Sequence, residues 1–96
     1  MSLDQERKKI NQIDQQIVAL YEDRLKVSEE IARLKAAQGA DIFVADREQA
    51  VIDNVQKGLK NPANADSVQK LYQEIMRLSR ERQQEVLAND QANPER

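Results

Sequence analysis

The 96-residue sequence contains no cysteine, no histidine and no tryptophan. The absence of cysteine excludes disulfides and thiolate chemistry. The absence of histidine removes the side chain on which most acid–base enzymes and transition-metal sites depend. The carboxylates also lack the clustered spacing of a calcium-binding loop. We therefore expect no bound metal, and an enzyme made from these residues would rely on positioning and electrostatics more than on proton transfer.

An excess of one charge and long apolar runs are missing as well. Fifteen basic and 17 acidic residues give a net charge of −2, so no basic field attracts nucleic acid or an anionic membrane. No apolar run approaches membrane-spanning length, and the opening residues MSLDQERKK contain no apolar signal segment. We expect a soluble, cytoplasmic protein with no nucleic-acid or membrane partner.

What the sequence does contain is typical of a helical protein. Charged residues make up 33% of the chain, and there are only two glycines, two prolines and three aromatic residues. The chain is rich in Ala, Leu, Glu, Lys, Arg and Gln, which favour helices. We predict an all-α fold with one domain over residues 1–90, followed by a polar tail over residues 91–96 that we expect to be disordered.

The first helix is predicted over Leu3–Gln38, ending at Gly39. Its apolar stripe, with the spacing of one helix face, consists of Ile10, Ile13, Ile17, Leu20, Val27, Ile31 and Leu34. At ~1.5 Å per residue this helix is roughly 54 Å long, whereas a compact chain of this size has a radius of gyration of about 12.5 Å. The helix would overhang the rest of the chain, so we expect a second copy to cover the stripe.

The second helix follows the connector GADIFVAD. Asp46 and Gln49 have the spacing of a capping box, which predicts a helix over Arg47–Lys60. Its apolar face consists of Val51, Ile52, Val55 and Leu59. The apolar residues 42–44 of the connector are expected to point inward.

The third helix follows a turn at KNPANAD, where Pro62 blocks continuation of the second helix. Asp66 and Gln69 repeat the capping pattern, which predicts a helix from there to about Ala88. Its stripe consists of Val68, Leu71, Tyr72, Ile75, Met76, Ser79, Gln83 and Val86.

Arg24 interrupts the stripe of the first helix where an isoleucine or leucine is expected. A guanidinium in an apolar seam costs several kcal/mol unless an anion meets it, and no obvious acidic residue lies on the same stripe. Lys35 follows eleven residues later, which places it ~20° from Arg24 around the helix and roughly 16 Å along it. The first helix therefore carries two cations on nearly the same line.

The other two helices also place polar groups on apolar faces. Ser79 and Gln83, one turn apart, replace aliphatic residues on the third helix, while Arg47 and Glu48 open the second, where Glu48 shares the apolar face. Two cations with a few hydrogen-bonding groups suit a small, doubly anionic ligand.

Each of these residues also has a structural interpretation. Arg24 can extend to solvent or pair with a glutamate of another helix, and Lys35 can complement the helix dipole. Ser79 and Gln83 can be a hydrogen-bonded core pair, and the first turn of the second helix can simply be solvated. Together the residues favour a binding site, but the pattern does not identify the ligand.

Three segments resemble the all-helical (type II) chorismate mutases: RKKINQIDQQIVALYEDRLKVSEEIARLK, DREQAVIDNV and YQEIMRLSRERQ. The resemblance covers roughly Leu3–Leu87. An arginine followed by I-x-x-I-D-x-x-I-V-x-L, and then Arg24 and Lys35 eleven residues apart, is specific in combination, although any one of the three segments alone would be weak.

The resemblance implies an intertwined homodimer of three-helix chains in which the long first helices span the dimer. It implies an isomerase that converts chorismate to prephenate by an intramolecular Claisen rearrangement, in the shikimate route to phenylalanine and tyrosine. The reaction needs no cofactor and no covalent intermediate. It requires a chair-like substrate and stabilisation of charge on the ether oxygen, so the absence of histidine and cysteine is no handicap.

By position, the resemblance also implies which residues are catalytic. Arg24 and Arg7 would clamp the substrate carboxylates, with Arg7 supplied by the other chain. Lys35 would contact a carboxylate and the ether oxygen, and Gln83 would be the second donor to that oxygen.

The remaining implied contacts come from the connector and the other two helices. Arg47 would help to bind a carboxylate, Glu48 would accept a hydrogen bond from the ring hydroxyl, and Ser79 would lie near a carboxylate. Val44 departs from a well-known branch of the family, which has an aspartate there, so only its backbone N–H can serve.

Two other functions compete with a stand-alone chorismate mutase. An isochorismate–pyruvate lyase resembles the mutases and uses a similar cationic pocket. A non-catalytic helical dimerisation module is a rival of another class, in which Arg24 and Lys35 would be incidental.

Overall fold

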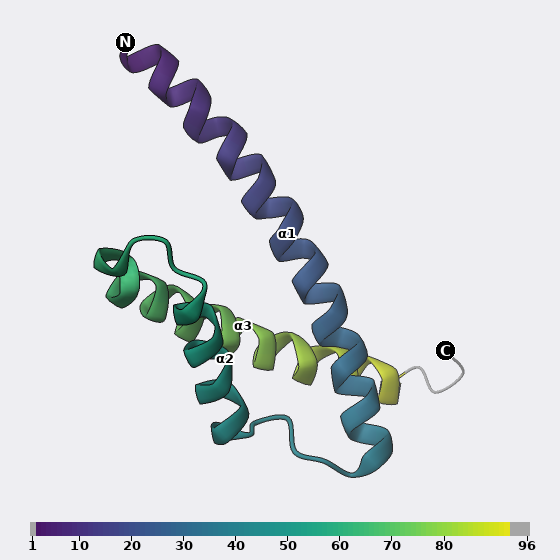
Figure 1. The fold of residues 1–96 in the computed structure, drawn as a ribbon. Coiled ribbons are helices and arrows are strands. Elements are labelled where there is room, and N and C mark those ends of the chain that lie inside the picture. The colour runs from purple at the N-terminus through teal and green to yellow at the C-terminus, as the bar shows by residue number, and fades with distance from the viewer. Residues whose placement is uncertain (1, 93–96) are drawn as a thin grey trace.

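A computed structural model describes residues 2–92, and within them the protein consists of helices with no strand. In chain order these are α1 (Leu3–Gln38), α2 (Ala45–Lys57), the short 3-10 helix η1 (Pro62–Asn64) and α3 (Ala65–Ala92). Figure 1 shows the long α1 crossing α3. The connector that leaves the end of α1 leads into α2. The predicted all-α fold with a long first helix is confirmed. Within the described residues, no helix combines the length and apolarity needed to cross a membrane.

The bounds predicted for α1 are confirmed, and both ends are capped. Ser2 and Gln5 form a capping box at the start, in which each side chain accepts a hydrogen bond from the other residue's backbone N–H at 3.1 Å. Gly39 ends the helix with a φ of 67°, a left-handed conformation that glycine adopts without steric cost. Its N–H and that of Ala40 bond back to the last-turn carbonyls.

The predicted start and end of α2 were wrong. The helix begins at Ala45, so Asp46 lies inside the first turn. The N-cap residue is Val44, whose side chain makes no capping hydrogen bond. Gln49 does not complete a capping box, because its Nε2 donates to Asp53 one turn later at 3.0 Å. The helix ends at Lys57 rather than Lys60, because the chain leaves it at Gly58.

The predicted cap of α3 was also wrong. Asn61, not Asp66, supplies the cap: its side chain accepts from the Ala63 N–H and starts η1, which leads directly into α3. Asp66 instead lies in the first turn of α3 and pairs with Lys70 at 2.9 Å. The helix continues to Ala92, so residues 91 and 92 of the predicted polar tail are helical, and residues 93–96 lie outside the described residues.

The apolar core is small and lies where the C-terminal half of α1 and helix α2 pack against α3 (Figure 1). Its buried apolar side chains are Ala32, Ile52, Met76 and Val86. Two ion pairs cross from α1 to α3, Arg33–Asp90 at 2.9 Å and Arg82–Glu29 at 3.1 Å. The side chain of Arg33 on α1 donates to Asp90, which raises the pKa of the guanidinium. This end of the molecule also contains the polar residues predicted from the three helices, apart from Arg7.

The N-terminal half of α1 extends away from that core (Figure 1). Every residue from 2 to 20 is exposed, including Ile10, Ile17 and Leu20, which are 58, 57 and 68% exposed. The radius of gyration is 17.0 Å, and the longest dimension is 56 Å. The overhang predicted from helix length is therefore present in the single chain.

The connector differs from its predicted inward orientation. Ile42 is half-buried, but Phe43 and Val44 remain 55 and 42% exposed. The connector joins the end of α1 to the start of α2 (Figure 1), and of its three apolar residues only Ile42 is half-buried.

Candidate active site

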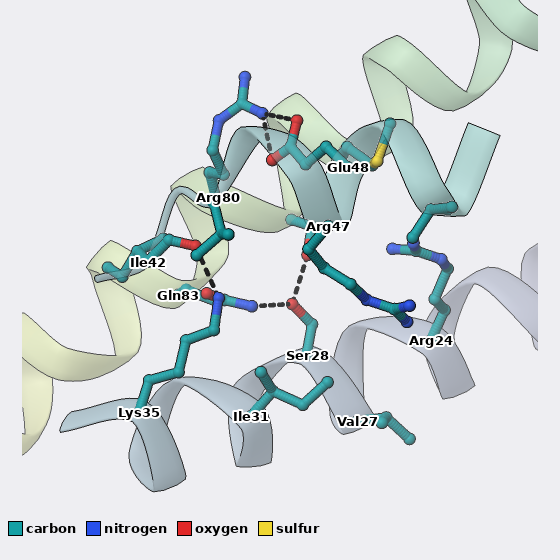
Figure 2. A pocket seen from close by; sticks show the side chains of 14 residues that line it. Arg24, Val27, Ser28, Ile31, Lys35, Ile42, Arg47, Glu48, Arg80 and Gln83 are labelled. Atoms are coloured by element: carbon teal, nitrogen blue, oxygen red, sulfur yellow. Dashed lines mark hydrogen bonds and ion pairs between the residues drawn. The ribbon is translucent and has the colours of Figure 1, made fainter. Parts of the chain in front are cut away.

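A pocket of about 290 Å³ lies between the C-terminal half of α1, the connector, α2 and α3. This is close to the lower end of the size range of small-molecule sites, which starts at about 300 Å³. Its walls are formed by Arg24, Val27, Ser28, Ile31, Lys35, Ile42, Val44, Arg47, Glu48, Val51, Met76, Ser79, Arg80 and Gln83. Figure 2 shows this mixture of aliphatic and polar side chains at close range.

Helix α1 contributes three polar side chains to the pocket because they share one face. Ser28 follows Arg24 by four residues and precedes Lys35 by seven, so each lies within ~40° of the others around the helix. Ser28 is 4% exposed, while Arg24 and Lys35 are half-buried. These three side chains lie beside the apolar stripe and line the pocket between the helices.

Helix α3 places Ser79 and Gln83 opposite these side chains, and the buried Ser28 and Gln83 form a hydrogen-bond network with the half-buried Ser79. The hydroxyls of Ser28 and Ser79 are hydrogen-bonded to one another. Gln83 Nε2 donates to Ser28 Oγ at 2.9 Å (Figure 2). Gln83 is only 6% exposed, yet its Oε1 has no hydrogen-bond partner within the described residues. A buried acceptor left without a partner costs about 1–3 kcal/mol.

Three cations of the pocket have no carboxylate partner within residues 2–92: Arg24, Lys35 and Arg47. The Arg24 guanidinium carbon lies 5.9 Å from the centroid of the Tyr72 ring. Lys35 Nζ donates to the Ile42 carbonyl at 2.7 Å and keeps two further donors. In a chain of net charge −2, this local excess of positive charge is suited to an anionic ligand.

Glu48 is the only carboxylate among the lining residues, and it is paired. Arg80 Nη1 lies 2.5 and 2.6 Å from its two oxygens. The guanidinium carbon of Arg80 is also 5.1 Å from the centroid of the Phe43 ring. Because Arg80 neutralises Glu48, no carboxylate in the described part of the chain compensates the positive charge of the other three cations.

The structure brings seven of the eight residues singled out from the sequence to this one pocket: Arg24, Lys35, Val44, Arg47, Glu48, Ser79 and Gln83. Val44 lines it at the start of α2, and its carbonyl is occupied by the Glu48 N–H. Arg7 is not part of the pocket: it is exposed on the protruding half of α1, roughly 25 Å along the helix from Arg24.

Among the polar residues of the pocket, the sequence pattern did not indicate two, Ser28 and Arg80. A signal for Ser28 was available, because it lies on the helical line that joins Arg24 to Lys35. Arg80 carried no such signal, since its partner Glu48 is 32 positions away and on another helix.

Within residues 2–92 the fold and the pocket together define a class: an all-helical protein with a cavity in which cationic side chains outnumber carboxylates. The chain matches the family of chorismate mutase type II over residues 6–84, which is more than half its length. The protein therefore belongs to the type II chorismate mutase family. No match was found among curated proteins.

Proposed function

We propose that this protein is a chorismate mutase that rearranges chorismate to prephenate. The observation that carries the proposal is a set of three cations, Arg24, Lys35 and Arg47, that have no carboxylate partner among the described residues and surround one half-apolar cavity in a member of this family. Chorismate carries two carboxylates and an apolar ring edge, so it matches both the charge and the aliphatic walls of the cavity.

The proposed chemistry requires no group that titrates near neutral pH. Holding the substrate in its chair-like conformation brings the two ends of the rearranging system together, and cations anchored to its carboxylates fix that conformation. Negative charge grows on the ether oxygen as the bond breaks, so a fixed donor at that oxygen lowers the barrier. In this assignment Arg24 and Arg47 bind carboxylates, and Lys35 contacts both a carboxylate and the ether oxygen.

Gln83 is assigned as the second donor to the ether oxygen, and its hydrogen bonding supports a specific orientation. With Nε2 directed at Ser28, the buried Oε1 has no partner among residues 2–92. If the amide turns over when substrate binds, Oε1 accepts from the Ser28 hydroxyl and both Nε2 hydrogens become available to the substrate. Ser79 would complete the network near a carboxylate, and Glu48 would accept from the ring hydroxyl with a lone pair that Arg80 leaves free.

A homodimer forms part of the proposal because α1 exposes an apolar stripe. Burying half-exposed aliphatic side chains such as Ile10, Ile13, Ile17 and Leu20 would contribute on the order of 5 kcal/mol per chain, which is comparable to the whole stability of a small domain. A second α1 packed on this stripe would also bring its Arg7 toward the pocket. Each site would then consist of one chain's pocket and the partner's Arg7.

The experiment is to incubate the purified protein with chorismate, follow the loss of its absorbance and identify the product. The expected product is prephenate. The same protein incubated with isochorismate should release no pyruvate. Release of pyruvate would indicate instead an isochorismate–pyruvate lyase of the same fold. A bicyclic dicarboxylate that mimics the transition state should bind and inhibit. Absence of both turnover and binding would identify a non-catalytic module.

A further inference from the structure

Arg80 differs from the other cations of the pocket because a carboxylate meets it. Its Nη1 contacts both oxygens of Glu48, and the two side chains are only 30 and 23% exposed. The pair joins α3 to the first turn of α2, 32 positions away in sequence (Figure 2). Ion pairs that are partly removed from water and contact both carboxylate oxygens fix side-chain direction better than exposed ones.

The same guanidinium contacts the connector, here residues 39–44. Its Cζ lies 5.1 Å from the centroid of the Phe43 ring, within cation–π range. More than half of the Phe43 side chain faces solvent, so burial does little to hold the ring in place. The contact with Arg80 therefore links Phe43 of the connector to α3.

The connector in turn holds the acceptor of Lys35. The carbonyl of Ile42, the residue next to Phe43, accepts a hydrogen bond from Lys35 Nζ at 2.7 Å. Arg80 is thus linked to two residues assigned to the substrate: to Glu48 directly, and to Lys35 through Phe43 and Ile42.

We propose that Arg80 is a positioning residue that directs the Glu48 carboxylate into the pocket and closes the connector over Lys35. Arginine suits both contacts, because a planar guanidinium can bind a carboxylate and stack on a ring, whereas a lysine ammonium is a point charge. The part of this inference that concerns Glu48 rests on the proposed function, but the connector contact does not.

The first test uses limited chymotrypsin digestion under native conditions, with cleavage after Phe43 identified by mass spectrometry. Arg80→Gln should increase the rate of this cleavage about fivefold, because the ring loses its cation. Arg77→Gln is the matched control: it lies one turn earlier on α3, and its partners Glu74 and Glu81 are both exposed. It should leave cleavage after Phe43 unchanged. Equal cleavage rates in wild type and Arg80→Gln would overturn the connector contact, whether or not the protein turns over chorismate.

The second test is a double-mutant cycle on chorismate rearrangement, with thermal melts to show that each variant is folded. Arg80→Gln should lower kcat/KM about tenfold, mainly through KM, and Arg80→Lys should recover only part of this loss. If Arg80 acts through Glu48, adding Arg80→Gln to Glu48→Gln should cost less than about a further twofold. Losses that multiply in the double variant would show that Arg80 does not act through Glu48 and would overturn that half of the proposal, while the digestion test decides the connector half.

Discussion

At the scale of single residues, Arg24 lies on the apolar stripe of α1, where a core residue is expected, but its positive charge is suited to binding an anionic ligand. Its half-buried guanidinium faces the Tyr72 ring but no carboxylate among the described residues. A cation partly removed from water without an anion is destabilising, so the position is costly to the free chain. A substrate carboxylate would remove that cost on binding.

Lys35 provides the most direct residue-level prediction. Lys35→Ala should lower turnover a hundredfold or more, because losing one donor to developing charge typically costs about 3–4 kcal/mol of transition-state stabilisation. Circular dichroism should show an intact fold. Lys57→Ala is the matched control, since Lys57 is likewise the basic residue in the last turn of its helix but does not line the pocket. A near-normal rate for folded Lys35→Ala would remove Lys35 from the mechanism.

The pH dependence of the rate tests the assignment of Gln83. The sequence contains no histidine or cysteine, so we expect nearly flat activity between about pH 6 and 8. In Gln83→Glu the carboxyl must be protonated to donate to the ether oxygen. Burial raises the pKa of such a carboxyl, and activity is present below that pKa and lost as the pH rises through it. Rate profiles of the two proteins check this: a steep wild-type fall through neutrality, or a flat Gln83→Glu profile, would contradict the assignment.

The residues of the pocket were predictable to the extent that helical periodicity reveals them. Arg24, Ser79 and Gln83 stand out because each is polar where the spacing demands an aliphatic side chain, and Lys35 because it lies ~20° from Arg24 around the helix. Arg80 could not be found in this way, because its two contacts, Glu48 and Phe43, come from other parts of the chain. Pairing between helices depends on how they pack, which local spacing does not encode.

At the scale of the elements, the helices were predictable, but their caps were less so. The 36-residue α1 was predicted to the residue, because its long apolar stripe and the glycine that follows it indicate the same helix. The starts of α2 and α3 were misplaced, because Asp46 and Asp66 are as favourable in the first turn of a helix, near its positive end, as at the cap itself. The backbone of Val44 and the side chain of Asn61 decide where the helical segments begin.

The two glycines allow a matched test of helix termination. Gly39 has a φ of 67°, whereas Gly58 has a φ of −82° and would place an added Cβ at 3.4 Å from the Val55 carbonyl, an ordinary contact. Gly39→Ala should therefore cost about 1–2 kcal/mol of unfolding free energy, while Gly58→Ala should be neutral or slightly stabilising. Denaturant unfolding measures both. An equal loss of unfolding free energy in the two variants would show that the left-handed conformation of Gly39 does not make this position more sensitive to substitution.

At the scale of the whole molecule, two features of the single chain support the proposed dimer. Its radius of gyration of 17.0 Å exceeds the roughly 12.5 Å of a compact chain of this length, because half of α1 has nothing to pack against. In addition, Arg7 lies on that protruding half and away from the pocket. A second chain laid along α1 would account for both features, as the proposed dimer requires.

The shared site can be tested by mixing inactive variants. Arg7→Ala and Arg24→Ala homodimers should each be nearly inactive. In a mixed dimer, the chain with Arg24 meets the partner that keeps Arg7, so one site is complete and the other lacks both. Random reassortment of equal amounts makes half of the dimers mixed, so about a quarter of wild-type sites should return.

A second pair of variants serves as the matched control. Arg24 and Lys35 line the pocket of the same chain, so mixing Arg24→Ala with Lys35→Ala leaves every site defective and should restore no activity. The decisive measurement is the rate of prephenate formation after co-refolding each pair, with mixed dimers confirmed by native mass spectrometry. About a quarter of the wild-type rate is expected for the Arg7 and Arg24 pair alone. A rate that stays at the parental level, although mixed dimers are present, would contradict the shared site.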